Sequence, residues 1–150
     1  CCALHRARNS LRLLRQRIWV TGVKTHEDWN LRPAFDLEGL KNTAPQPNLP
    51  AWIRRLVDIR KSSPALRWGG YVQRLVAADQ FAFSRHWEKE TVLVLLNNAN
   101  NQTDVSVPMP GMAGKLFIDL LTQGDAFTSD GRGNLAIPMH PKSARILRGE

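Results

Sequence analysis

The sequence predicts a mainly β protein, an antiparallel β-sandwich preceded by one amphipathic helix. Three observations support this fold class. Apolar residues recur at helical spacing over residues 49–62, ahead of a proline and a glycine pair. Beyond residue 70 the apolar period falls from about 3.6 residues to two. About seven or eight short strands then follow, separated by turn residues at the intervals typical of a sandwich.

The predicted helix begins after Asn48, a residue type that favours the N-cap position. Its apolar face carries Leu49, Trp52, Ile53, Leu56, Val57 and Ile59, and charged residues occupy the other side. Ser62-Ser63-Pro64 ends the helix, because the residue before a proline avoids the helical conformation. Gly69-Gly70 then allows the backbone to turn. Trp52 is interpreted as a core residue because it shares the spacing of Ile53 and Leu56.

The strands are predicted from the alternation of apolar and polar residues. The run at 91–96 is apolar throughout, which predicts a central strand buried on both faces. Glu88-Lys89 is expected to form a hairpin turn, and Asp130-Gly131-Arg132-Gly133 a tight turn. The expected strands are 72–78, 81–87, 91–96, 105–107, 116–121, 135–139 and 143–148.

The basic charge of the chain is concentrated at its start. Of the 21 lysines and arginines, five are arginines within residues 1–17, a segment without acids. The remaining 16 basic and 13 acidic residues leave a net charge of only +3. Residues 1–19 admit three interpretations: an arm that binds phosphates, a transit peptide, or a non-native or disordered basic tail. Residues 20–48 have no sustained period and are expected to form a long connection.

Several kinds of site are not expected from the sequence. No two of the four histidines have the spacing of paired metal ligands, so neither a metal site nor a cofactor is predicted. No apolar run approaches the roughly 20 residues of a membrane span. The two cysteines are adjacent and provide no disulfide framework, which indicates either a reducing compartment such as the cytoplasm or a protein that does not need disulfide bridges. Trp29, in a polar loop, is the better tryptophan candidate for ligand contact.

Several segments, taken in order, resemble the C-terminal part of the alpha-amylase family (glycoside hydrolase family 13). The most similar types are cyclomaltodextrinases, neopullulanases and maltodextrin-degrading amylases. The matching segments are LVDIRKSSPALR at 56–67 followed by Gly70-Tyr71, FAFSR at 81–85, TVLVLLNN at 91–98, IDLLT at 118–122, and the closing strands at 135–147. The resemblance extends over roughly residues 20–150.

The resemblance implies a (β/α)8 barrel followed by a C-terminal sandwich, and retaining cleavage or transfer at α-glucosidic bonds. Residues 20–68 would then be a loop-rich remnant of the barrel end, with its last helix at about 49–62, and residues 69–150 the amylase-type C-terminal sandwich. Trp52, Leu56 and Val57 would face missing barrel elements, which leaves an apolar patch exposed or repacked. The family's catalytic carboxylates lie on earlier barrel strands, and no acid of this chain matches their motifs. No catalytic residue is therefore expected here.

The family often places an aspartate and, four residues later, an arginine beside the substrate cleft. Asp28 and Arg32 have this spacing and enclose Trp29, so these three residues are the candidate substrate-binding residues. This sequence lacks the proline that often follows the aspartate. A structural Asp–Arg pair that holds a loop is the alternative interpretation.

The resemblance also suggests an origin for residues 1–19. Back-translation of residues 8–19 with a shift of one nucleotide can encode Gly-Ile-Pro-Ser-Val-Tyr-Tyr-Gly-Ser-Glu-Phe, which resembles the family's eighth barrel strand. The basic segment is then a frameshift product. The chain is expected to be a fragment of an α-glucan hydrolase that contacts maltodextrins through the parent barrel. The alternatives are a non-catalytic carbohydrate-binding or interaction module and, last, a nucleic-acid-binding protein.

Overall fold

The computed structural model describes residues 48–122 and 124–149. The chain divides into two compact units, residues 1–58 and 59–150, which are described separately. In the first unit the description covers only Asn48 and the beginning of helix α3 (Leu49–Ser62). The basic segment at 1–19 and the predicted connection up to residue 47 lie outside the described residues.

Helix α3 begins where the sequence predicts. The amides of Ala51 and Trp52 donate to the Asn48 carbonyl oxygen at 3.1 and 3.2 Å. The apolar face is open: Trp52 is 52% exposed, and Leu56 and Val57 are also exposed. The interpretation of Trp52 as a core residue from its spacing is therefore wrong for the described part of the chain. The exposure of Trp52, Leu56 and Val57 instead agrees with the apolar patch expected from the family resemblance. Neither described helix has the length and apolar character needed to cross a bilayer.

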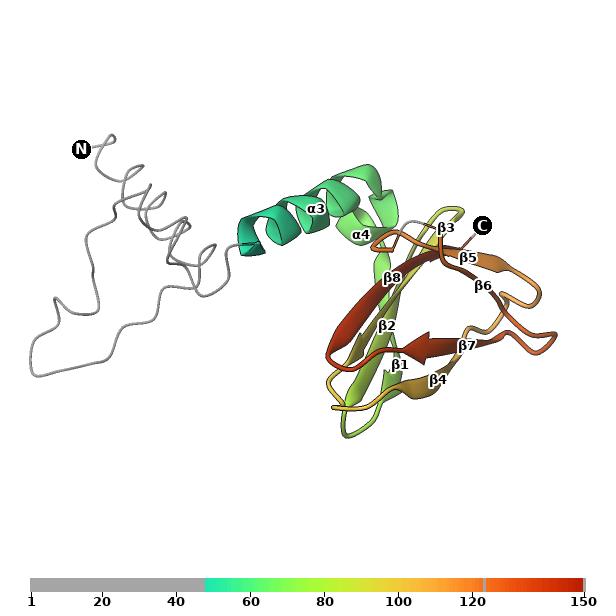
Figure 1. Ribbon diagram of the computed structural model, residues 1–150. Coiled ribbons are helices and arrows are strands. Elements are labelled where there is room, and N and C mark those ends of the chain that lie inside the picture. Colours follow the sequence, from blue (N-terminus) through green and yellow to red (C-terminus); the bar gives the residue numbers. More distant parts are fainter. Residues whose placement is uncertain (1–47, 123, 150) are drawn as a thin grey trace, which may run out of the picture. The chain divides into compact units, whose positions relative to one another are not determined.

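The second unit is built on two antiparallel sheets (Figure 1). The larger has the strand order β1-β2-β3-β8-β5-β6, and the smaller pairs β4 with β7. This confirms the predicted sandwich. The strands are β1 (Gly70–Val76), β2 (Gln80–Trp87), β3 (Glu90–Asn97), β4 (Thr103–Pro108), β5 (Leu116–Asp119), β6 (Ala126–Thr128), β7 (Asn134–Met139) and β8 (Ser143–Gly149). The three-residue strand β6 was not predicted.

The main core lies between the two sheets. Alternate residues of β2, β3, β5 and β8 point toward β4 and β7, as the two-residue period of a strand requires. This inner face buries apolar side chains from both sheets: Ala82, Leu93, Leu95, Val105, Val107, Met109, Phe117, Leu135, Ile137, Met139 and Leu147.

The apolar run of β3 is only partly covered on the opposite, outer face of the large sheet. Val92 is fully buried, but Leu96, at the other end of the strand on the same face, is 43% exposed. The prediction of burial on both faces is therefore correct near Val92 and wrong near Leu96. The segment that precedes β1 covers the end of the outer face that includes Val92.

That segment is a short second helix, α4 (Pro64–Trp68), which was not predicted. Pro64 ends α3 as expected, but Ser63 then caps a new helix by accepting the Leu66 amide proton at 3.1 Å. The amide of Ala65 donates to Glu90 Oε2 at 2.8 Å. At the other end of the helix the Arg85 guanidinium donates to the Gly69 carbonyl oxygen at 2.6 and 3.2 Å.

Helix α4 and the last turn of α3 build a second core on the outer face. Its buried residues are Ile59, Ala65, Leu66, Val92, Leu121 and Ile146. The helix thus covers the end of the sheet where the β2–β3 hairpin turns, at Glu88, which adopts a positive φ of 52°.

A buried ion pair closes the inner face beside β6. Arg145 Nη1 donates to Asp119 Oδ2 at 2.8 Å and to Asp125 Oδ2 at 2.7 Å, and its guanidinium lies 5.0 Å from the Phe127 ring centre. The Thr122 hydroxyl donates to Asp119 at 2.7 Å. The hydrogen bonds from Arg145 and then Thr122 lower the pKa of Asp125.

The predicted tight turn at Asp130 is present. Asp130 Oδ1 accepts the amide protons of Asn134 at 2.7 Å and Arg132 at 2.8 Å, and Oδ2 accepts from the Asn134 side chain. The hydrogen bonds from Asn134 are the main cause of the lowered pKa of Asp130. The turn therefore depends on the ionised carboxylate.

The first prediction concerns the fit between α4 and β2. A Cβ atom at Gly69 would overlap the Ala65 carbonyl oxygen and lie 2.8 Å from that of His86, whereas a Cβ at Gly70 meets nothing within 4 Å. Gly69→Ala is expected to lower the free energy of unfolding by about 1–3 kcal/mol, and Gly70→Ala by less than about 0.5 kcal/mol. Urea unfolding of both variants measures this, and equal losses would contradict the role assigned to Gly69.

The second prediction concerns pH. Asp125 and Asp130 have folded-state pKa values below 3.8, so at acidic pH the unfolded chain binds more protons than the folded one. Their stabilising effect is present above about pH 4 and is lost as pH falls further, through the folded-state pKa values. Urea midpoints measured from pH 5 to pH 2 should fall on acidification. The fall should be smaller in D125N and D130N than in D104N, and equal slopes would exclude these two groups as the cause.

Candidate functional site

The outer face of the large sheet is the candidate functional surface. The strand register fixes which side chains it presents, because neighbours in adjacent strands share a face. Tyr71 and Gln73 of β1 pair with Arg85 and Phe83 of β2, and Phe83 pairs with Val94 of β3. These residues face away from the smaller sheet. Ala82 and Leu95, their neighbours along β2 and β3, point the other way and pack in the core between the two sheets.

Three aromatic rings lie in succession on this face. The Tyr71 and Phe83 ring centres are 5.3 Å apart, and those of Phe81 and Phe83 are 5.9 Å apart, both in tilted arrangements. Tyr71 is 55% exposed, and the two phenylalanines are partly buried. The outer face thus combines an end that α4 covers with an open apolar area.

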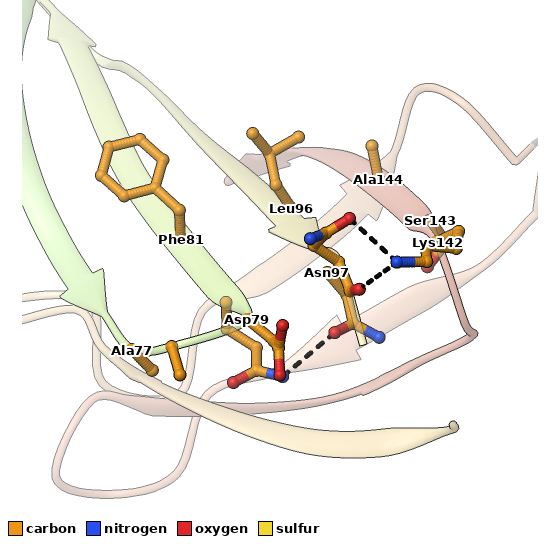
Figure 2. A pocket seen from close by; sticks show the side chains of 11 residues that line it. Ala77, Asp79, Phe81, Leu96, Asn97, Lys142, Ser143 and Ala144 are labelled. Atoms are coloured by element: carbon orange, nitrogen blue, oxygen red, sulfur yellow. Dashed lines mark hydrogen bonds between the residues drawn. The ribbon is translucent and has the colours of Figure 1, made fainter. Parts of the chain in front are cut away.

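A groove lies at the open end of this face, at the end of β2 opposite α4 (Figure 2). It has a volume of about 530 Å³. Its apolar floor is a row across three neighbouring strands, because Phe81 pairs with Leu96 and Leu96 pairs with Ala144. In Figure 2 these three side chains project to the same side of the sheet. The β1–β2 turn at residues 77–79 borders the floor.

Polar side chains of the groove are fixed by internal hydrogen bonds. Asn97 is buried; its Oδ1 accepts from Gln80 at 3.0 Å and from the Ala99 amide at 3.1 Å, and its Nδ2 donates to the His140 carbonyl oxygen. Lys142 Nζ donates to the backbone oxygen of Asn98 at 2.7 Å and to its Oδ1 at 3.2 Å (Figure 2). The rim is therefore preorganised by its own contacts.

Two polar groups of the groove keep free capacity. Within residues 48–149, apart from 123, no side chain or amide donates to the Asp79 carboxylate, and Asn98 Nδ2 has no acceptor. Lys142 adopts a positive φ of 49°, an uncommon conformation for a residue other than glycine, which brings its backbone amide to the Ala99 carbonyl oxygen. The groove thus offers an acceptor and donors around an apolar floor.

The candidate residues from the sequence, Asp28, Trp29 and Arg32, lie outside the described residues, so their grouping stays a prediction. Among residues 48–122 and 124–149, no three histidine, cysteine or acidic side chains are placed to hold a metal ion. His86 is instead 2.9 Å from the Thr91 hydroxyl through Nδ1.

Sequence reasoning missed the groove. The alternation around Phe81 and Phe83 marks one face of β2, but the floor needs the pairings with β3 and β8, and Ala144 is far away in the sequence. The available signal was the polar cluster at residues 97–101 directly after an apolar strand. Such loops at strand ends commonly carry functional residues.

A comparison with protein-family models finds a match to the maltogenic amylase C-terminal domain over residues 74–146. The match covers strands β2 to β7 entirely, the end of β1 and the first part of β8. Among curated protein sequences, none matches the chain.

Solved structures with the same fold include two alpha-amylases and a protein named AmyP. An Anoxybacillus alpha-amylase is 23% identical with a TM-score of 0.68, over 85% of this chain and 26% of that one. The Geobacillus thermoleovorans alpha-amylase complexed with acarbose is 18% identical with a TM-score of 0.73, over 89% and 28%. An AmyP variant in complex with maltotriose is 19% identical with a TM-score of 0.66, over 81% and 25%.

The chain therefore spans about a quarter of the length of these proteins. At such identities the similarity establishes the fold alone. The family-model match and the two-sheet architecture agree on the same residues and the same fold. Residues 74–146 therefore match the model of the maltogenic amylase C-terminal domain and have the two-sheet fold of the solved amylase structures.

Proposed function

We propose that this chain is the C-terminal part of an alpha-amylase-family glycoside hydrolase that acts on α-glucans or maltodextrins, and that it holds no catalytic carboxylates itself. The match of residues 74–146 to an amylase C-terminal domain carries this proposal. Solved structures of the same fold in complex with maltose, maltotriose and acarbose support the substrate class. The cyclomaltodextrinase or neopullulanase type is proposed from the sequence resemblance.

The role proposed for the β-domain is to cover the catalytic barrel of that hydrolase. Helix α4 closes one end of the outer face, and beside it Tyr71 is exposed while Phe83 and Val94 are only partly buried. A contiguous apolar face of this kind indicates an interaction surface. Solved structures of the same fold belong to proteins that are several times longer than this chain, so the proposed occupant is the barrel that makes up most of such a protein.

The described acids support the proposed lack of activity. Retaining hydrolysis needs a carboxylate nucleophile and a protonated carboxylic acid about 5–5.5 Å apart. Asp119 and Asp125 are close together because both bind Arg145 Nη1. Arg145 and Thr122 lower the pKa of Asp125, whereas a general acid needs a raised one. This pair serves the sandwich core.

The gene tests the proposal. DNA upstream of this chain should encode a barrel with the family's acidic motifs in a neighbouring reading frame. The frame-restored protein, in which that barrel is joined in one reading frame to the residues described here, should hydrolyse maltodextrin. The 150-residue chain alone should release no product from a chromogenic maltoside above the uncatalysed rate. The proposal fails if the upstream DNA encodes no such barrel, or if the 150-residue chain turns over the maltoside.

The third prediction tests the barrel-covering face with two neighbouring residues of β1. Tyr71 faces the proposed barrel, and Val72, also exposed, points to the opposite side. In the frame-restored protein, Tyr71→Asp should cost about 2 kcal/mol of unfolding free energy, because it places a charge in an apolar interface. Val72→Asp should cost less than about 0.5 kcal/mol.

The isolated 150-residue chain is the control for this pair of variants. In the isolated chain, Tyr71→Asp removes the contact between the Tyr71 and Phe83 rings but no contact with a barrel. Both substitutions should therefore have similar, small effects on thermal unfolding. Equal effects of Tyr71→Asp in the isolated chain and in the longer protein would show that no barrel covers this face.

A further inference from the structure

The groove at the open end of the outer face is not lined by Tyr71, Phe83 or Val94, the residues proposed to face a barrel. Its floor of Phe81, Leu96 and Ala144 lies at the end of the sheet where β1 turns into β2, while α4 contacts the β2–β3 hairpin at the other end. The two surfaces adjoin at the Phe81 and Phe83 rings and have different lining residues.

The lining combines two kinds of contact. The floor offers a phenyl ring and two aliphatic side chains, and the rim offers a carboxylate, an amide and an ammonium group from Asp79, Asn98 and Lys142. A pyranose has matching features, because its axial C–H groups form apolar faces and its hydroxyl groups, at the edge, both donate and accept hydrogen bonds. The volume of about 530 Å³ accommodates two or three sugar units.

The charges of the rim favour a neutral ligand. Asp79 and Lys142 carry opposite charges, so neither an anion nor a cation gains from the pair as a whole. The Asp79 carboxylate keeps all its acceptor capacity, and Asn98 Nδ2 keeps its donors, as described above. Since Asn97 and Lys142 are already held by hydrogen bonds, binding would cost little side-chain entropy.

We propose that this groove is a malto-oligosaccharide binding site that gives the β-domain its own contact with the glucan chain. Phe81 supplies the stacking surface, Asp79 accepts from sugar hydroxyls, and Asn98 donates to them. The choice of an α-1,4-glucan rests on the proposed function, whereas the preference for a neutral polyol follows from the groove itself.

The fourth prediction is tested by NMR, with a titration of maltotriose into the isotope-labelled 150-residue chain. Amide resonances of residues 77–81, 96–98 and 142–144 should shift with a dissociation constant of about 1 mM. Cellotriose, which has the same sugar units in β-linkage, should bind at least about fivefold more weakly. Absence of shifts at about 20 mM maltotriose, shifts confined to another surface, or equal binding of cellotriose would overturn the proposal.

Matched variants assign the contacts. Phe81→Leu keeps the apolar volume but removes the ring face, and should weaken binding about fivefold. Tyr71→Leu removes an exposed ring outside the groove and should leave binding unchanged. Asp79→Ala should weaken binding, whereas Asp104→Ala, the same charge change on β4, should not. Weakening by the control variants to the same degree would overturn the assignment.

The test of the groove can succeed or fail independently of the test of the proposed function. Binding is measured on the chain without a barrel, and hydrolysis is measured on the frame-restored protein. If the longer protein hydrolyses maltodextrin while maltotriose does not bind the chain, only the groove assignment fails. If maltotriose binds the groove while the upstream DNA encodes no barrel, only the proposed function fails.

Discussion

The close approach of α4 to the β2–β3 hairpin determines how the rest of the domain presents its outer face. The helix can sit there because Gly69 has no side chain, while Glu90 accepts the Ala65 amide proton and Arg85 binds the Gly69 carbonyl oxygen. These contacts bury Leu66 against the sheet. They close one half of the outer face and leave the other half as an apolar area with a polar groove at its end. The two proposed contacts of the domain follow from this division.

Most strands could be predicted because their signal is local. A two-residue alternation or an apolar run, with turn residues at each end, identifies β2, β3, β7 and β8 without knowledge of their partners. Helix α3 has the predicted bounds for the same reason. The three-residue strand β6 shows no period of its own; it forms because Phe127 pairs with Phe117 of β5 and packs beside Arg145.

The features that were missed depend on distant residues. Helix α4 is only five residues long, and its amide partner Glu90 lies 25 positions from Ala65. The groove requires three strands to pair in one register, and a one-residue slip would send Phe81 to the inner face. The wrong expectation at Leu96 has a similar cause, because an apolar run does not show which element covers it, and Leu96 is exposed in the described chain. Spacing alone likewise failed to identify the surroundings of Trp52, whose exposure was expected only from the family resemblance.

The inner face thus stabilises the fold, whereas the outer face is available for recognition. Charged groups on the inner face serve the fold, since Arg145 is nearly buried between two carboxylates and stacks on Phe127. The outer face keeps the groups that the fold does not use, namely the Tyr71 ring, the open end of β3 and the Asp79 carboxylate. This division agrees with the proposal that the domain contacts a barrel and a glucan and that the catalytic acids belong to another part of the protein.

The most direct test of the barrel-covering role is the reactivity of Tyr71 toward hydroxyl radicals, measured by mass spectrometry. It is compared between the 150-residue chain and the frame-restored protein. In the chain alone the ring is 55% exposed and should be oxidised readily. We predict strong protection of Tyr71 in the longer protein, with Val72 on the opposite side unchanged. Equal oxidation of Tyr71 in both proteins would contradict the claim that the outer face covers a catalytic barrel.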